Sequence, residues 1–323
     1  MEPLPSFSEI EAAKALIRPH IRETPTYRWP LLEAGLGCEL WLKHENHTPV
    51  GAFKIRGGLV YVDELKRQQP EVRGVIAATT GNHGQSIAFA AKLNGLRAVI
   101  VVPHGNSKEK NRAMLAQGVE LIEHGHDFQE SLEFARTLAE QRGLVMVDSF
   151  HERLVMGTAT YAMEFLQGTP ALDCVYVPIG LGSSICGVSA ARNALGLKTE
   201  IVGVVAEQSS SYALSFEQRI VVAAPSDTKI ADGLACRLPN AKAMDVIWEN
   251  VARIVRVTDD EIADAMRALY QDTHNVAEGA GAAALAGALK ESDSLPRKRI
   301  GIVLTGGNVD SDMYAQVLAG AKA

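Results

Sequence analysis

The 323-residue sequence is 47% hydrophobic and 22% charged, a globular composition with enough apolar residues for one large core or two cores sharing a cleft. The formal net charge is −6 and no long basic run occurs, so nucleic acid and anionic membranes are poor candidates as partners. The sequence has no apolar run that could cross a bilayer, no signal-peptide pattern at its start and no C-x-x-C pair among its four cysteines, so we expect a cytoplasmic protein with free thiols.

Helical and strand patterns alternate through the first half of the chain. Ser8 and Glu11 have the spacing of a capping box, which predicts a helix over 8–18. A short strand over 40–43 precedes a glycine-rich segment, and 58–68 is predicted to be a helix. Further strands are predicted at 75–78, 98–102, 119–123 and 144–147, and helices at 82–93, 107–117 and 128–141.

The alternation continues in the second half. Helices are predicted at 158–166, 184–195, 259–274 and 277–290, and strands at 174–178, 201–206, 254–257 and 300–304. Thr258 and Glu261 form a second capping box. Short, continuously apolar strands separated by helices long enough for crossovers indicate an α/β fold with parallel strands covered on both faces. The pattern allows one large sheet or two domains.

Lys54 lies in a segment of small residues that includes Gly51, Ala52, Gly57 and Gly58. A lone lysine is most often a solvated surface residue. Here the apolar neighbour Phe53 argues against an exposed face. A lysine sheltered from water has a lowered pKa, and its amine can act as a nucleophile or base.

Three apolar strands run directly into glycine-rich loops that open helices, at 79–84 (TTGNHG), 180–184 (GLGSS) and 305–308 (TGGN). In open α/β sheets, ligands bind beyond the carboxyl ends of the strands. A helix N-terminus offers free backbone N–H groups and a partial positive charge to an anion. One such loop is weak evidence, but three of them together with the lysine segment indicate a binding site for an anionic ligand.

The middle loop is the best candidate for a phosphate. Gly180 and Gly182 let the backbone approach a ligand, and Ser183 and Ser184 add hydroxyl donors. A plain tight turn and a dinucleotide site are the alternatives. The dinucleotide fingerprint G-x-G-x-x-G is broken because the third glycine, Gly187, comes two positions late.

The segment Ala52-Phe53-Lys54-Ile55-Arg56-Gly57-Gly58 resembles the motif S/A-F-K-x-R-G-A of fold-type II pyridoxal-phosphate enzymes, the threonine/serine dehydratase and serine racemase family. The resemblance runs over nearly the whole chain. It implies a two-domain α/β fold like that of the tryptophan synthase β chain, with open, mostly parallel twisted sheets and helices on both faces. The large domain would comprise 1–49 and 151–323, and the small inserted domain 50–150.

The resemblance also implies roles for individual residues. Lys54 would hold pyridoxal phosphate as a Schiff base and act as the catalytic base. Asn82 would bind the ring hydroxyl, Gly233 would lie against the ring, and the hydroxyl of Thr305 would bond to the pyridine nitrogen. The expected cofactor-binding residues are Phe53, Lys54, Asn82, Gly180, Leu181, Gly182, Ser183, Ser184, Gly233 and Thr305.

The first loop resembles S-x-G-N-H-[AG], which cradles the substrate carboxylate. The expected substrate-binding residues are Thr79, Thr80, Gly81, Asn82 and His83. Thr80 stands where racemases carry a serine that acts as a second acid/base, so we name it as a second catalytic candidate; capping the following helix is its alternative role. His83 is expected to be a packed neutral histidine that contributes only its backbone.

Other family features are altered. G-L-G-S-S replaces the usual run of glycines, and Glu278-Gly279-Ala280-Gly281-Ala282 resembles E-P-A/S-G-A with a glycine in place of proline. Glu278 would line the site or lie exposed at a helix end. Some members bind a divalent cation through a glutamate and an aspartate six residues on, but Glu207 is followed at that distance by Ala213, so no metal is expected.

The resemblance implies a lyase of the threonine/serine dehydratase type. It would convert a β-hydroxy L-amino acid, through an enamine, into a 2-oxo acid and ammonia, and would form a homodimer. A racemase of the same fold, a nicotinamide-dependent oxidoreductase and a non-catalytic ligand sensor are the alternatives. Serine, threonine, 3-hydroxyaspartate and phenylserine remain open as substrates because they differ only at the β-substituent.

Overall fold

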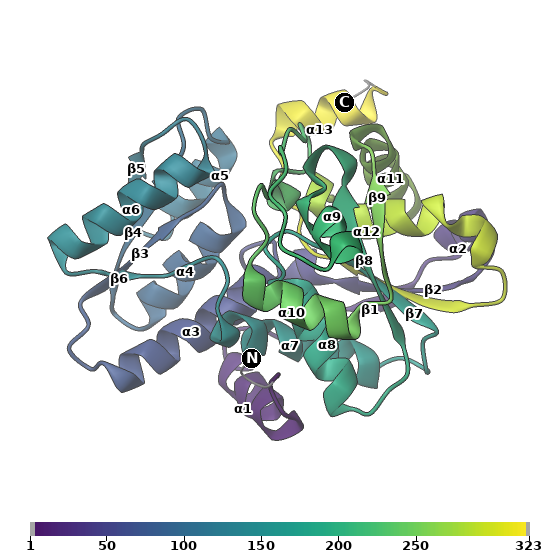
Figure 1. Cartoon of the computed structure of the whole chain (residues 1–323), viewed down its shortest axis with the longest axis horizontal. Coiled ribbons are helices and arrows are strands. Elements are labelled where there is room, and N and C mark those ends of the chain that lie inside the picture. Colours follow the sequence, from purple (N-terminus) through teal and green to yellow (C-terminus); the bar gives the residue numbers. More distant parts are fainter. Residues whose placement is uncertain (1–3, 321–323) are drawn as a thin grey trace.

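The computed structural model describes residues 4–320 and contains two β-sheets (Figure 1). The six-stranded sheet has the strand order β1-β2-β10-β7-β8-β9, and the four-stranded sheet has the order β5-β4-β3-β6. The strands are β1 (Thr26–Arg28), β2 (Glu39–His44), β3 (Gly74–Ala78), β4 (Arg97–Val102), β5 (Glu120–Glu123), β6 (Val145–Met146), β7 (Cys174–Pro178), β8 (Glu200–Ala206), β9 (Arg253–Val257) and β10 (Arg299–Leu304).

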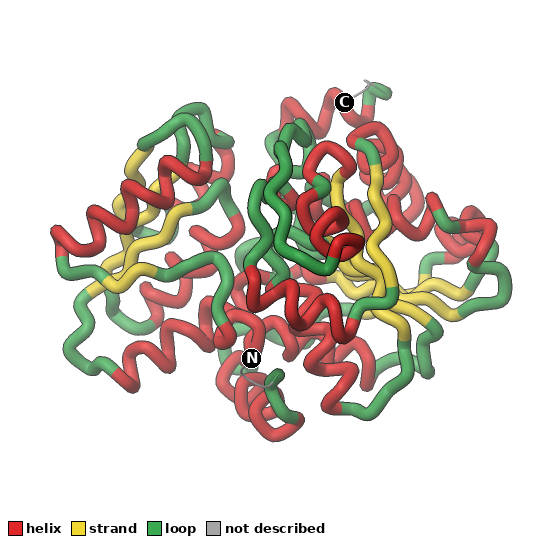
Figure 2. The backbone as a smooth tube through the Cα atoms, viewed as in Figure 1, coloured by secondary structure: helices red, strands yellow, loops and turns green. Residues whose placement is uncertain are grey.

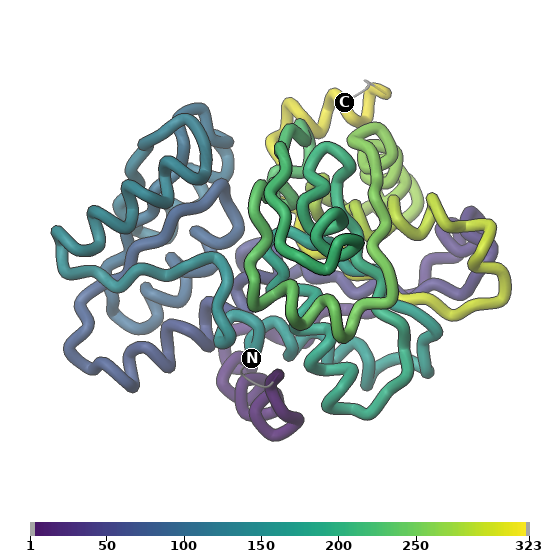
Figure 3. Tube along the Cα trace, viewed as in Figure 1, coloured from purple at the N-terminus to yellow at the C-terminus, as the bar shows by residue number. Residues whose placement is uncertain are grey.

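Neighbouring strands are parallel except β1, which pairs antiparallel with β2. The chain leaves the larger sheet after β2, builds the smaller sheet and returns at β7, as the colour order of Figure 3 shows. The predicted fold class, mostly parallel sheets in an α/β protein, is confirmed.

Helices cover both faces of the six-stranded sheet (Figure 2). The α-helices are α1 (Phe7–Ile17), α2 (Pro30–Leu36), α3 (Lys54–Gln68), α4 (Asn82–Leu93), α5 (Lys108–Leu115), α6 (Phe128–Arg142), α7 (Glu152–Gln167), α8 (Ser183–Ala194), α9 (Ser211–Gln218), α10 (Ala241–Asn250), α11 (Asp259–Thr273), α12 (Gly279–Lys290) and α13 (Ser311–Leu318). Short 3₁₀ helices are η1 (Glu45–His47), η2 (Glu207–Ser209), η3 (Asp232–Leu234) and η4 (Ser292–Ser294).

Alternate residues of each central strand serve two separate cores. In β7, Tyr176 belongs to the core beneath α11 and α12, whereas Val175 and Val177 belong to the core beneath α7, α8 and α10. Successive side chains of a strand point to opposite faces of the sheet, so a strand buried on both faces is apolar throughout. This burial explains why these strands were recognisable as continuous apolar runs.

The predicted cap of the first helix is wrong. Ser6 and Glu9 form the capping box of α1, and Ser8 lies inside the helix. The S-x-x-E spacing occurs twice in this segment, so spacing alone could not choose between the two. The second predicted capping box, Thr258 with Glu261 at the start of α11, is confirmed.

Two helices begin earlier than predicted, and glycines near their N-terminal ends allow close packing. α3 begins at Lys54 rather than residue 58, and α7 begins at Glu152 rather than residue 158. A Cβ atom on Gly157 would lie 2.3 Å from the carbonyl oxygen of Arg56, so only glycine permits this crossing of α7 against α3. The elements β1, α2, α9, α10 and α13 were not predicted.

Candidate active site

The segment that carries Lys54 is fastened to the loop after β10. The backbone N–H of Phe53 donates to the carbonyl of Thr305 (3.0 Å), and that of Gly307 donates to the carbonyl of Gly51 (2.9 Å). Gly51 has a φ of 68°, a left-handed conformation that glycine adopts readily. These bonds place Lys54, the first residue of α3, beside the carboxyl end of β10.

Lys54 is partly buried, and its amine lies 5.7 Å from the centre of the Phe53 ring. Burial lowers the pKa of this lysine to about 8, against the opposing attraction of the Glu278 carboxylate. A substantial neutral fraction therefore exists near neutral pH, and only the neutral amine is a nucleophile or base. The apolar setting that the sequence suggested for this lysine is present.

Behind the lysine lies a buried ionic network. The guanidinium of Arg56 bonds to Glu45 (2.8 and 3.0 Å) and to Glu164 (2.9 Å to each oxygen), and Lys43 also bonds to Glu164 (2.9 Å). Two positive and two negative groups balance, which removes the penalty of an isolated buried charge. The network anchors the first turn of α3 and thus fixes the base of the Lys54 side chain.

The loop after β7 leaves a helix N-terminus without a side-chain cap. Gly182 is the N-cap of α8, with a φ of 98°, and no side chain caps that end. A Cβ atom on Gly180 would lie 2.3 Å from the carbonyl oxygen of Gly233, so the two loops meet closely. Ser183 and Ser184 are buried, and the Ser184 hydroxyl pairs with that of Tyr161 (2.6 Å). The loop can therefore offer backbone N–H donors to an anion.

The loop after β3 is held by Thr79. Its hydroxyl accepts hydrogen bonds from the backbone N–H groups of Gly81 (2.9 Å) and Gly84 (3.3 Å), so Thr79 rather than Thr80 braces the start of α4. Thr80 is half-buried, and its hydroxyl has no hydrogen-bond partner among the residues that the structure describes. Its predicted alternative role as the helix cap is therefore wrong.

His83 is buried behind this loop, where its Nε2 donates to the carbonyl of Val147 (3.3 Å). Burial, with a smaller contribution from the charge of Lys54, lowers the pKa of His83 to about 3. The imidazole is therefore neutral at pH 7.

Asn82 connects the first and third loops. Its Nδ2 donates to Glu278 Oε1 (2.6 Å), and its Oδ1 accepts from Asn308 Nδ2 (2.7 Å). Nδ2 carries two hydrogens, so one remains available to a ligand. These two hydrogen bonds fix the orientation of the Asn82 side-chain amide, with Nδ2 as the donor and Oδ1 as the acceptor.

Glu278 is buried rather than exposed at a helix end. Burial raises its pKa to about 7, opposed by Lys110 and reinforced by Asp232. Its Oε2 is buried and has no hydrogen-bond partner among residues 4–320. The sequence suggested Glu278 only as one of two alternatives and did not single out Lys110, because no short motif contains both residues.

Thr305 and Gly233 complete the site. Thr305 is buried, with its hydroxyl 3.5 Å from the carbonyl oxygen of Ala280, and a Cβ on Gly233 would lie 2.8 Å from the Cβ of Ala280. The predicted residues around Lys54, Asn82, Gly180, Gly233 and Thr305 are thus linked through direct neighbours, although they come from distant parts of the chain.

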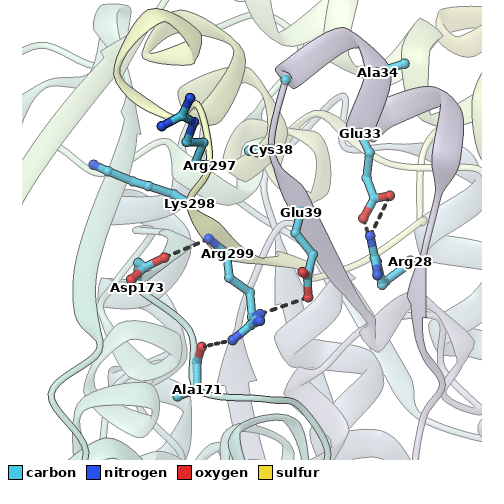
Figure 4. A pocket seen from close by; sticks show the side chains of 11 residues that line it. Arg28, Glu33, Ala34, Cys38, Glu39, Ala171, Asp173, Arg297, Lys298 and Arg299 are labelled. Atoms are coloured by element: carbon cyan, nitrogen blue, oxygen red, sulfur yellow. Dashed lines mark hydrogen bonds and ion pairs between the residues drawn. The ribbon is translucent and has the colours of Figure 1, made fainter.

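A separate open depression of about 610 Å³ lies at the amino ends of β2, β7 and β10, opposite the edge that carries Lys54 (Figure 4). Its charged side chains largely satisfy one another: Arg28 pairs with Glu33 (2.7 Å) and Arg299 with Glu39 (2.8 Å). We therefore do not assign the chemistry to it. Between residues 4 and 320, no cluster of three or more His, Cys, Asp or Glu side chains is arranged for a metal ion.

The residues near Lys54 fit pyridoxal phosphate. The lysine can supply a neutral amine, the uncapped N-terminus of α8 can receive a phosphate, and the glycines at 180 and 233 keep the space between the loops narrow enough for backbone contacts. Glu278 Oε2, a buried polar atom without a partner, also indicates that the site is built for a polar ligand.

Known proteins resemble the chain over nearly its whole length. It is 34% identical to the catabolic L-threonine dehydratase of Staphylococcus aureus, covering 97% of this chain and 92% of that one. It is 31% identical to the L-threo-3-hydroxyaspartate ammonia-lyase of Saccharomyces cerevisiae, covering 99% and 98%. A crystal structure of a pyridoxal 5'-phosphate-dependent aspartate racemase superposes with a TM-score of 0.91 at 27% identity, covering 97% and 98%.

The family model described as pyridoxal-phosphate dependent enzyme matches residues 17–306. This match spans both sheets, the lysine segment and the first two residues of the loop after β10. The chain therefore belongs to the family of pyridoxal-phosphate dependent enzymes.

Proposed function

We propose that this protein is a pyridoxal-phosphate dependent ammonia-lyase that converts a β-hydroxy L-amino acid into a 2-oxo acid and ammonia. The observation that carries the proposal is the partly buried amine of Lys54, with its pKa lowered to about 8, at the meeting point of the glycine loops. The similarity to a threonine dehydratase and a 3-hydroxyaspartate ammonia-lyase supports a lyase with a hydroxy amino acid as substrate.

In the proposed mechanism, each part of the site has a separate role. Bound pyridoxal phosphate supplies an aldehyde for amine attachment and a ring that accepts electrons from the substrate α-carbon. Lys54 would hold the cofactor, and its amine, when not attached to the cofactor, would take the α-proton on Nζ. The loop at 180–184 would bind the phosphate, the Asn82 amide and the Thr305 hydroxyl would orient the ring, and the loop at 79–83 would receive the substrate carboxylate. A neutral hydroxyl at Thr305 would leave the pyridine nitrogen largely unprotonated, which would suit elimination.

The test is ammonia release from a panel of β-hydroxy amino acids that includes threonine, serine, 3-hydroxyaspartate and phenylserine. Wild-type protein should release ammonia and a 2-oxo acid from at least one, and borohydride reduction should attach the cofactor to Lys54. Lys54→Ala should lose both ammonia release and cofactor attachment. Lys108→Ala, which changes an exposed lysine of α5, should keep both properties. Full activity of Lys54→Ala would refute the assignment.

A racemase is the second candidate. The hydroxyl of Thr80 is free of other described partners, as a second acid/base requires, and the aspartate racemase structure shares the fold. Chiral analysis of the same incubations separates the two reactions. A racemase would give the D-enantiomer, and Thr80→Ala would abolish it while sparing ammonia release.

We further propose a cytoplasmic homodimer in which 50–150 forms the small inserted domain and 1–49 with 151–323 the large one. Four buried free cysteines support a reducing compartment. Between residues 4 and 320, no helix is both long and apolar enough to cross a membrane. The edge strand β1 exposes Tyr27, and α2 beside it exposes Leu31, which supports a second copy at this edge.

A further inference from the structure

Glu278 is a buried carboxyl group whose negative charge is not balanced by its hydrogen-bond partner. Its side chain is 4% exposed, one oxygen accepts from Asn82, and the other has no hydrogen-bond partner in the part of the chain that the structure describes. A buried carboxylate without a counter-charge takes up a proton. A neutral carboxyl group is a weaker acceptor than a carboxylate, so its hold on the Asn82 amide would weaken.

The nearest cation is Lys110, which comes from helix α5 beside the four-stranded sheet. Its Nζ lies 3.9 Å from Glu278 Oε2 and 2.6 Å from Asp232 Oδ2. The lysine side chain is only 9% exposed, whereas that of Asp232 is 43% exposed. Water can therefore solvate Asp232, but the charge of Glu278 depends on Lys110. An ammonium group has three N–H donors and can serve both carboxylates.

Several contacts fix where this ammonium lies. A Cβ atom on Gly81 would lie 2.5 Å from Lys110 Cδ, so the aliphatic part of the lysine packs directly on the loop before α4. At the start of α5, Ser107 bonds to Asp310, and Glu109 accepts from the Ser311 hydroxyl (2.6 Å). Helix α5 is thus docked on the segment that begins α13, and Lys110 reaches across to η3 and α12.

We propose that Lys110 is a positioning residue that favours the charged form of Glu278 and thereby holds the Asn82 amide in one orientation at the cofactor site. The chain of contacts runs from Lys110 through Glu278 to Asn82, and Asn308 fixes the other side of that amide. One Nδ2 hydrogen of Asn82 then remains available to the cofactor. The inference rests on the proposed role of Asn82 as a cofactor-binding residue. It adds Lys110, which lies on α5, to the residues that would position this amide.

The charges that face the two groups set the direction of the expected effects. Glu278 faces Lys110, Asp232 and Lys54, together with the neutral Asn82, and Lys110 faces Asp232, Glu278 and Asp310. Burial raises the pKa of Glu278 to about 7, and Lys110 opposes that rise. Removing the ammonium must raise this pKa further, and removing the Asp232 charge must lower it.

The experiment compares purified holoenzymes without substrate. The visible absorption of bound pyridoxal phosphate is titrated between pH 5.5 and 9.5, and its dissociation constant is measured by adding the cofactor to apoenzyme at pH 7. In wild type, Glu278 should give an absorbance transition near pH 7, and the absence of this transition would contradict the proposal. In Lys110→Met, this transition should move up by about one pH unit, and the dissociation constant should rise about tenfold. Lys110→Arg should restore the dissociation constant to within about twofold of wild type, and Lys108→Met, on the exposed side of α5, should resemble wild type.

Two further variants test whether Lys110 acts through Glu278. Glu278→Gln should abolish the transition near pH 7, and adding Lys110→Met to it should change neither reading further. Asp232→Asn changes a half-exposed side chain and should therefore leave folding intact. It should move the transition to lower pH. An unmoved transition in both Lys110→Met and Asp232→Asn, or additive effects of Lys110→Met and Glu278→Gln, would overturn the proposal.

The proposed reaction and the proposed role of Lys110 can be tested independently of each other. If wild-type protein bound the cofactor but released no ammonia from any hydroxy amino acid, the reaction would be wrong. The spectral and binding comparisons would still decide the role of Lys110.

Discussion

Lys54 and Arg56 lie two residues apart in the chain but have opposite electrostatic surroundings. The amine of Lys54 meets one distant carboxylate and a phenyl ring, and burial lowers its pKa. The guanidinium of Arg56 is enclosed by Glu45 and Glu164 and stays charged. One turn of helix thus supplies a reactive cation and a structural one, and the difference comes from partners far along the chain.

The structural cation leads to a stability prediction. Glu164→Ala would leave Arg56 and Lys43 buried with one carboxylate fewer, and should lower the free energy of unfolding by about 3–5 kcal/mol. Burial alone would raise the pKa of Glu164, but Arg56 and Lys43 lower it, so the carboxylate is charged at pH 7. The measurement is urea unfolding followed by circular dichroism.

The control is Glu120→Ala, which breaks a partly exposed pair with Arg97 and Arg142. It should cost less than about 1 kcal/mol because solvent screens exposed pairs. Equal losses in the two variants would show that the buried network contributes no more than a surface pair.

His83 predicts a dependence of stability on pH. The pKa of His83 is about 3 in the folded protein, below the ordinary value of 6.5. Between these pH values the imidazole is protonated in the unfolded chain but neutral in the folded protein. Stability must therefore fall as the pH drops below about 6.5, by up to about 1.4 kcal/mol per pH unit for this histidine. His83→Gln keeps a donor for the Val147 carbonyl and should reduce the slope between pH 6 and 5 by about that amount.

Other groups titrate in the same range, so the comparison must be made between slopes. His44 has a pKa lowered to about 4 and contributes in the same direction, whereas Glu278, with its raised pKa, contributes in the opposite direction. Both are present in wild type and in His83→Gln, and they cancel in the difference. Parallel slopes in the two proteins would contradict the assignment.

At the scale of elements, glycines set how closely segments approach. Gly157 lets α7 cross α3 at the Arg56 carbonyl, and Gly180 lets the loop after β7 meet the loop that contains Gly233. In both places the neighbour is backbone, which cannot rotate away as a side chain can. At these two positions the glycines therefore fix rigid contacts between backbone segments.

Gly180→Ala tests this point. The added Cβ would lie 2.3 Å from the Gly233 carbonyl oxygen and would push the two loops apart. Overpacking of this kind typically costs about 1–3 kcal/mol, which corresponds to a rise of about 5-fold to 150-fold in the dissociation constant for pyridoxal phosphate if the loops separate at the cofactor. Gly35→Ala, in α2 with no atom within 4 Å of the added Cβ, is the control and should bind the cofactor like wild type. Unchanged affinity in Gly180→Ala would mean that this loop does not hold the cofactor.

At the scale of the whole molecule, the site is assembled between the two sheets. Asn82 and Lys110 belong to helices around the four-stranded sheet, whereas Glu278 and Thr305 belong to segments around the six-stranded sheet. The hydrogen bond from Asn82 to Glu278 and the ion pair of Lys110 with Asp232 connect the two sides. Any movement of the sheets relative to each other would therefore change the site.

The proposed homodimer is tested at this scale by native mass. Wild type should have twice the mass of one chain, and Tyr27→Glu combined with Leu31→Glu should shift it towards the monomer, because two charges would be buried at the edge of β1. Leu93→Glu, at an exposed position at the end of α4, is the control and should stay dimeric. A monomeric wild type would refute the dimer, and a dimeric double variant would move the interface to another face.

The sequence by itself determined the fold class and most of the central strands, and it singled out Lys54 and the three glycine loops, because each leaves a local signal. A strand buried on both faces is a continuous apolar run, and a loop at the end of such a strand needs glycine. Local spacing failed at the cap of α1, where two equivalent spacings compete, and at the starts of α3 and α7, where glycines serve packing between helices.

Only the tertiary structure decided which side chains meet. The contact of Asn82 with Glu278 joins residues 196 positions apart, and that of Lys110 with Asp232 joins residues 122 apart. The ionic network around Arg56 and the burial of Glu278 depend in the same way on chain segments brought together by the two sheets. Charge, burial and pKa are properties of the neighbours in space, and no local pattern of residues encodes those neighbours.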